Sequence, residues 1–202
     1  MSDPTKSDVY EILLPHCARI EKCVREAWGN YRWLLSSEKP VKNKRTIANT
    51  IWDWSVQTAL LEFSGDPRVK PIHRGTHTTW FLVDGKVVFR FKKGGDDGYS
   101  KNYPTQSALD FHEPDRQLDG LPEVIKVDVV YITDETNSEV KDIRVVCRNG
   151  SKISWSFSLL RESLAEMVEI PRQVQLPEGR TRVVLKKPLA DSFETLDSRI
   201  EK

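Results

Sequence analysis

The fold is decided by residues 78–93, which read TTWFLVDGKVVFRFKK. Two runs rich in β-branched and aromatic residues flank Asp84-Gly85, a dipeptide that favours a two-residue hairpin turn. In the second run, apolar and polar residues alternate, which predicts a strand with one face in the core and the other toward water. The core face carries Val87, Phe89 and Phe91, and the water face carries Arg90 and Lys92.

The sequence on either side of this hairpin predicts helices before it and further strands after it. Apolar residues recur at helical spacing from Val9 to Leu34, interrupted by Pro15, and a second helix is expected at about 46–63. Pro104 suits the first turn of a short helix. The remaining predictions are strands at 69–72, 124–133, 140–147, 152–157 and 180–187, and the short helix at 104–112.

This order of elements predicts an α+β fold. An N-terminal helical pair precedes an antiparallel or mixed sheet with one short inserted helix, and the helices are expected on one side. We expect a helical segment at 1–63 and a mixed sheet region at 64–187, which together form one compact unit, and a flexible tail at 188–202.

The composition limits the classes of function. The 202 residues are 38% hydrophobic and 30% charged, as in an ordinary soluble globular protein. The net charge of +1 attracts neither nucleic acid nor membranes, so any such binding must come from a local patch. No run approaches the roughly 20 apolar residues that span a bilayer. Three cysteines without a CxxC pair, and no signal-peptide pattern, predict a cytoplasmic protein without disulfides.

The element order also resembles the core of the PD-(D/E)xK nuclease superfamily, and a degenerate core of that kind is the alternative fold. The resemblance would place Asp84 after the second strand, Arg90-Phe91-Lys92 in the acid-x-Lys triplet and Gln106 on the following helix. Two carboxylates must converge on Mg²⁺ beside a lysine that activates water. Arg90 stands where the second carboxylate belongs and repels a metal ion.

An active nuclease therefore remains an alternative function, with Mg²⁺ as its cofactor and Asp84, Lys92 and Gln106 as candidate catalytic residues. Glu62, Asp96 or Asp97 could supply the missing carboxylate. The pair His73 and His77 is a second metal pattern, but the intervening Gly75 argues against a helix and no third ligand is near. Apart from the nuclease alternative, we expect neither a metal site nor a cofactor.

Residues 89–93 (FRFKK), residues 102–106 (NYPTQ) and Phe111 resemble a motif of an uncharacterised family of bacterial and phage accessory proteins. Further similar positions occur up to Trp155, so the resemblance spans about 69–157. It implies a cytoplasmic bacterial accessory protein of the kind found in toxin–antitoxin or phage-defence operons.

Basic and amide side chains near the end of the hairpin predict a groove for an anionic partner, either nucleic acid or a phosphorylated ligand. The expected contact residues are Arg90, Lys92, Lys93, Asn102, Thr105 and Gln106. Arg90 and Lys92 would neutralise phosphate, while the two amides would donate hydrogen bonds. The alternative is a protein-binding module, such as an inhibitor or an antitoxin partner, which the near-neutral charge and the helical segment favour.

Overall fold

The structure is a computed structural model, and it describes residues 5–37, 43–75, 78–101 and 105–160. The chain divides into two units, Met1–Ile170 and Pro171–Lys202, and all the elements below belong to the first. The strand expected at 180–187 and the tail expected at 188–202 lie outside the described residues.

The N-terminal helical pair is present. Helix α1 (Lys6–Leu13) begins after Thr5, whose side chain accepts a hydrogen bond from the Asp8 backbone amide, and continues through a 3₁₀ turn, η1 (Leu14–His16), into α2 (Cys17–Ser37). Pro15 lies in that turn, which confirms the predicted interruption. Helix α3 (Lys44–Glu62) follows, with Asn43 as its N-cap.

Six strands form one mixed sheet in the order of the chain. The strands are β1 (Val69–His73), β2 (Thr79–Val83), β3 (Val87–Lys93), β4 (Ile125–Thr133), β5 (Val140–Asn149) and β6 (Lys152–Ser158). All neighbours pair antiparallel except β3 and β4, which are parallel and are linked through α4 (Gln106–His112). The predicted α+β class is therefore confirmed.

The turn between β2 and β3 is the predicted two-residue hairpin. Asp84 and Gly85 have φ values of 50° and 68°, and the Lys86 amide donates to the Val83 carbonyl over 2.9 Å. Positive φ at both central residues defines a type I′ turn, whose twist matches that of the strands. The Arg68 guanidinium binds both carboxylate oxygens of Asp84, at 2.8 and 2.6 Å, and so ties the turn to the start of β1.

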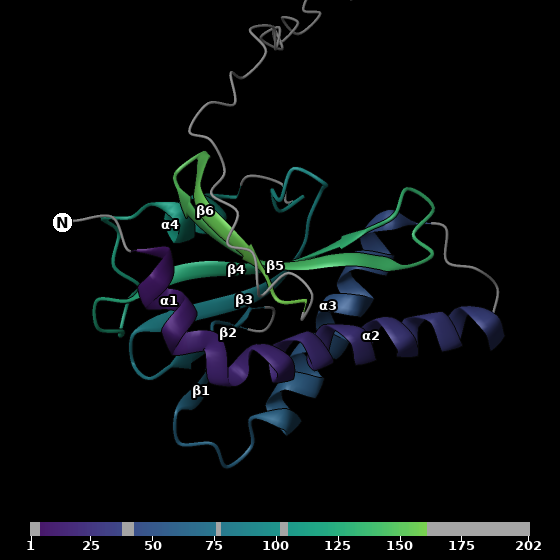
Figure 1. The fold of residues 1–202 in the computed structure, drawn as a ribbon, viewed down its shortest axis with the longest axis horizontal. Helices are drawn as coiled ribbons and strands as arrows, with labels where there is room; N and C mark the ends of the chain where they lie inside the picture. The colour runs from purple at the N-terminus through teal and green to yellow at the C-terminus, as the bar shows by residue number, and fades with distance from the viewer. Residues whose placement is uncertain (1–4, 38–42, 76–77, 102–104, 161–202) are drawn as a thin grey trace, which may run out of the picture. The chain divides into compact units, whose positions relative to one another are not determined.

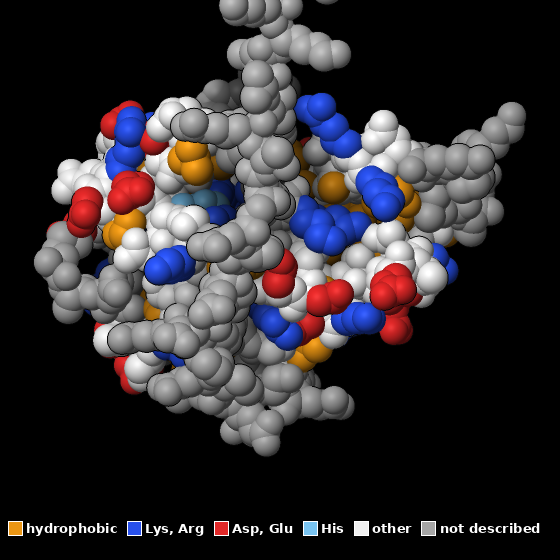
Figure 2. Space-filling model, turned by 90° about the horizontal axis from the view of Figure 1, so that it is seen from above, with side chains coloured by type: hydrophobic (Ala, Val, Ile, Leu, Met, Phe, Trp, Pro, Cys, Tyr) orange, Lys and Arg blue, Asp and Glu red, His pale blue; other side chains and the backbone are white. Residues whose placement is uncertain are grey.

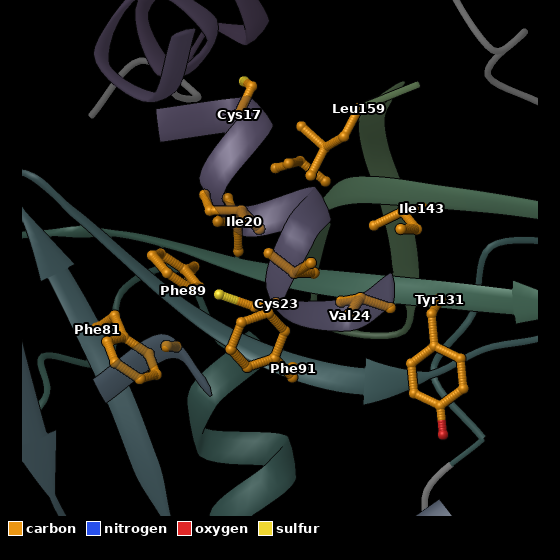
Figure 3. Packing of buried hydrophobic residues seen from close by; sticks show 14 of the residues in the cluster. Cys17, Ile20, Cys23, Val24, Phe81, Phe89, Phe91, Tyr131, Ile143 and Leu159 are labelled. Carbon is orange, nitrogen blue, oxygen red and sulfur yellow. The ribbon is translucent and has the colours of Figure 1, made fainter. Parts of the chain in front are cut away.

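Helices α1, α2 and α3 pack on one face of the sheet and α4 packs on the other (Figure 1). The expectation that the helices share one side is thus wrong for α4. The connection between the parallel strands β3 and β4 must cross one face of the sheet, and α1–α3 already cover the other. In Figure 3, Ile20 and Cys23 of α2 point toward Phe89 and Phe91 of β3. This contact is the centre of the main hydrophobic core.

The α4 face has two smaller apolar clusters. One contains Trp80, Leu82, Val88, Phe111 and Leu118, and the other contains Val130, Ile132 and Val146. The buried charged side chains Arg90 and Asp128 belong to this face and to neither cluster.

Within the described residues, no helix combines the length and the apolar character that crossing a membrane requires.

Candidate functional site

A buried ion pair and a histidine join β3, β4 and α4. The parallel register sets Arg90 directly opposite Asp128, and the Arg90 Nε atom donates to Asp128 Oδ1 over 2.7 Å. His112, the last residue of α4, places its Nε2 atom 2.8 Å from Asp128 Oδ2 and 3.1 Å from Arg90 Nη2. The guanidinium also lies over the Phe111 ring, with its carbon 3.7 Å from the ring centroid. These contacts fix α4 on the sheet.

The expectation that Arg90 points to water is therefore wrong. Its side chain does lie on the face opposite Phe89 and Phe91, as the alternation predicts, but α4 covers that face and Arg90 is only 5% exposed. An arginine can be buried in this way because Asp128 neutralises it and the aromatic ring of Phe111 stacks on it.

The electrostatics of this trio leave it close to neutral. Burial by itself would raise the pKa of Asp128, but the Arg90 charge and the contact with His112 hold that pKa well below its usual range. Burial lowers the pKa of His112, and Asp128 only partly opposes this. At neutral pH the trio thus contains one carboxylate, one guanidinium and a neutral imidazole.

Two further cations lie beside the trio. Lys92, two residues after Arg90 on the same face, is half-buried, and burial together with the Arg90 charge lowers its pKa to about 8. Arg148 of β5 is also half-buried, and its Nε atom has no hydrogen-bond partner. Neither has a carboxylate within ion-pair distance among the described residues. Lys92 and Arg148 therefore give the α4 face an excess of positive charge that is partly shielded from water.

The loop after β3 folds back over this face. Gly94 pairs with Ser100, and the Gly95 amide donates to the Tyr99 carbonyl over 3.0 Å. A Cβ atom on Gly94 would lie 2.1 Å from Val130, so only glycine permits this approach. The loop brings the Tyr99 ring to the Arg148 guanidinium, whose carbon lies 5.3 Å from the ring centroid.

The C-terminal end of β3 carries a second group of cations. Lys93 lies on the opposite face from Lys92, and its ammonium donates to Asn137 Oδ1 over 2.5 Å. The backbone amide of Lys101 donates to the Lys93 carbonyl over 2.8 Å. Burial lowers the pKa of Lys93, and the nearby charges of Lys101 and Lys44 lower it further. The charges of Lys101 in the following loop and of Lys44 in α3 thus act on Lys93, and Asp134 partly offsets them.

The structure divides the predicted binding residues. Arg90 and Lys92 share the α4 face, whereas Lys93 faces the other way. Thr105 is the N-cap of α4, and its hydroxyl accepts a hydrogen bond from the backbone amide of Ala108. The side-chain amide of Gln106 donates to Asp110 Oδ1 over 2.8 Å. Both residues are exposed. Asn102 lies outside the described residues.

The proposed nuclease residues are not brought together. Asp84 lies in the turn before β3 and Lys92 lies five residues after Val87, so a rise of about 3.3 Å per residue separates them by roughly 16 Å or more. Asp84 is also held by Arg68, and Glu62 by Arg19 and Lys22. Across the described ranges, no group of three or more His, Cys, Asp or Glu side chains could hold a metal ion.

Sequence reasoning missed Asp128, His112, Arg148 and Tyr99. One signal was available, because Asp128 interrupts the otherwise apolar run from Val127 to Ile132 and must therefore find a partner. His112 and Arg148 gave no such signal, since their approach depends on the crossover through α4 and on the register of β5.

A cavity of about 870 Å³ adjoins this face where β4 begins, and Lys126 and Arg148 contribute to its wall. Figure 2 shows several Lys and Arg side chains gathered on the face seen from above, with Asp and Glu side chains beside them.

No protein-family model, curated protein or solved structure matches the chain.

Proposed function

We propose that this chain is a bacterial accessory protein that binds an anionic partner, with nucleic acid favoured, at the C-terminal end of β3. The observation that supports this is that Lys93 lies within the electrostatic influence of Lys101 and Lys44, whose charges add to burial in lowering its pKa and are only partly offset by Asp134. Lys92 adds a fourth cation from the other side of the strand. Mutual repulsion of this kind is relieved when an anion binds.

The start of α3 strengthens the attraction. Its first turn contains Lys44 and Arg45 and no acidic residue, although the positive end of a helix dipole favours acids there. Backbone amides and two cations thus act in the same direction, toward a negatively charged partner.

The distribution of these cations favours a polymer over a small anion. They lie on both sides of one strand end, on a loop and on a helix, as contacts to successive phosphates of a nucleic acid would require. Arg90 is buried and cannot reach a phosphate, so its contribution is to hold α4 on the sheet and to lower the pKa of Lys92.

The experiment is a fluorescence anisotropy titration of labelled single-stranded RNA and DNA at several salt concentrations. Affinity should fall steeply with salt, and each of Lys44→Gln, Lys93→Gln and Lys101→Gln should weaken binding and reduce the salt slope by about one unit. Lys86→Gln, an exposed lysine at the opposite end of β3, is the matched control. Binding that is absent, or equally reduced by Lys86→Gln, would overturn the proposal.

The titration should also depend on pH in a defined direction. Lys92 carries its charge below a pKa of about 8 and loses it above. Affinity should therefore decline between about pH 7 and pH 9, and Lys92→Gln should remove that part of the decline. The same slope in Lys92→Gln as in the unmodified chain would exclude Lys92 from the binding surface.

The setting in a toxin–antitoxin or phage-defence operon is a proposal based on the sequence resemblance. Growth inhibition on expression in a bacterial host, relieved by a product of a neighbouring gene, supports it. A stoichiometric protein complex without nucleic acid would replace it with a protein-binding role.

A further inference from the structure

The cavity of about 870 Å³ lies at the opposite end of β3 from the lysine group. Its wall includes Lys86 from the turn before β3, and Ile125 and Lys126 from the start of β4. Helix α1 and the segment that follows α4 complete it. The volume is in the range of small-molecule sites, which are commonly 300–1,000 Å³. Because it lies at the other end of β3, the cavity is separate from the nucleic-acid surface proposed above.

Two half-buried cations of the sheet form part of its wall. The Lys126 ammonium donates to the backbone carbonyls of Glu113 and Arg116, the latter over 2.7 Å. The Arg148 Nε atom is buried and has no hydrogen-bond partner. Burial lowers the pKa of both side chains, so an anion placed against them would stabilise their charged forms.

Acidic side chains line the exposed part of the same cavity. They are Asp8, Glu11, Glu113, Asp115 and Glu123, and all five are exposed. The exposed part also carries Lys86 and Arg116, the latter paired with Asp110, so that carboxylates outnumber cations there, whereas the half-buried part carries Lys126 and Arg148. A ligand complementary to this layout has an anionic end that reaches the sheet and a cationic end that remains near the opening.

We infer that this cavity binds a small phosphorylated amine, with the phosphate against Arg148 and Lys126 and the ammonium group among the acidic side chains. Two cations suit a phosphate dianion, and the guanidinium fork of Arg148 matches its oxygens. The carboxylates repel a second phosphate, which selects a monophosphate over a polyphosphate or a nucleic acid strand.

The test is isothermal titration calorimetry of the full chain with three probes of graded charge. O-phosphoethanolamine carries both groups, glycerol 3-phosphate carries only the anion, and ethanolamine carries only the cation. We expect the affinity to fall in that order. Equal affinities, no binding of the two phosphates, or binding of ethanolamine as tight as that of O-phosphoethanolamine would overturn the inference.

Variants separate the two ends of the site. Arg148→Gln should weaken both phosphates at least tenfold, whereas Lys152→Gln, an exposed lysine at the start of the neighbouring strand, should change neither. Glu123→Gln should weaken O-phosphoethanolamine and leave glycerol 3-phosphate unchanged or tighter. Unchanged phosphate affinity in Arg148→Gln, or parallel losses in Glu123→Gln, would reject the arrangement.

A further pair of measurements guards against a general loss of structure. Thermal unfolding should show that Arg148→Gln stays folded, and Arg148→Lys, which keeps the charge without the fork, should bind phosphate with intermediate affinity. If Arg148→Gln unfolds, Arg148→Lys alone decides, and unchanged phosphate affinity in that variant counts against the inference. Nucleic-acid affinity should be the same in these variants as in the unmodified chain, so this inference and the proposed function can fail independently.

Discussion

The two faces of the sheet differ sharply although the same strand forms part of both. On the face toward α1–α3, Phe89 and Phe91 are fully buried in a continuous apolar core. One residue away, Arg90 faces α4 and is buried against Asp128 and His112. The apolar face supplies most of the stabilisation by burial, whereas a buried ion pair contributes little net stability and instead demands complete pairing. The two faces of one strand thus differ in what burial requires: close apolar packing toward α1–α3, and complete charge pairing toward α4.

The largest expected effect is on the apolar face. Phe89→Ala removes a fully buried ring that stacks on Phe81, with centroids 5.1 Å apart, and should lower the free energy of unfolding by about 3–5 kcal/mol. Urea unfolding followed by tryptophan fluorescence measures it. Val88→Ala, a fully buried neighbour that faces α4, is the matched control and should cost less. Equal losses of unfolding free energy would contradict the view that the face toward α1–α3 dominates stability.

Asp128→Asn should have the next largest effect, because it leaves Arg90 charged, buried and without its carboxylate. Breaking a buried pair in this way costs roughly 3 kcal/mol or more. Replacement of both partners, as in Arg90→Met with Asp128→Leu, should recover most of that loss, since it removes both desolvated charges. The comparison of the two variants by urea unfolding isolates the pairing requirement from packing.

The double replacement also tests the role of the α4 face. If the ion pair exists only to hold α4, the double variant should keep the nucleic-acid affinity that we propose for the unmodified chain. A cost below 1 kcal/mol for Asp128→Asn would show that water reaches Arg90, and that the α4 face is more open than its 5% exposure indicates.

A substitution at Gly94, where the loop after β3 lies against Val130, should have a smaller effect on the free energy of unfolding. Gly94→Ala would place a methyl group 2.1 Å from Val130 Cγ1 and should cost about 1–3 kcal/mol, as overpacking usually does. Adding Val130→Ala should relieve part of this cost, so the double variant should be more stable than the sum of the two changes implies. Gly29→Ala, in α2 with nothing within 4 Å, is the control and should be neutral or stabilising. Additive losses at Gly94 and Val130 would contradict the contact.

The sequence predicted the elements well because each depends on local signals. The type I′ turn follows from Asp84-Gly85, the break between α1 and α2 from Pro15, and the inward face of β3 from the alternation of its phenylalanines. The site was predicted only in part. Whether Arg90 meets water or a carboxylate depends on which strand pairs with β3 in parallel, and β4 is more than thirty residues away in the chain. Such long-range pairing leaves no local pattern at Arg90 itself.

The smallest expected effect concerns His16, the buried histidine on the apolar side. Both of its ring nitrogens are buried without hydrogen-bond partners, and Nδ1 lies 3.9 Å from Asp66 Oδ2, beyond hydrogen-bond distance. Burial lowers the pKa of His16 more than Asp66 raises it, so the folded state favours the neutral ring. The unfolded chain takes up the proton first as the pH falls below about 6.5. Stability should therefore be complete above that pH and decline below it, by less than about 1.4 kcal/mol per pH unit for one group.

His16→Leu should flatten this decline, measured as the urea midpoint between pH 7 and pH 5, because leucine cannot be protonated. His112 on the α4 face has a lowered pKa as well, so it should leave a residual slope in His16→Leu. The slope that survives in His16→Leu thus reports on the α4 face, and the slope that is lost reports on the apolar face. An unchanged slope in His16→Leu would mean that the pKa of His16 is the same in the folded and unfolded chains, whereas a steeper decline would mean that protonated His16 pairs with Asp66 on the apolar face.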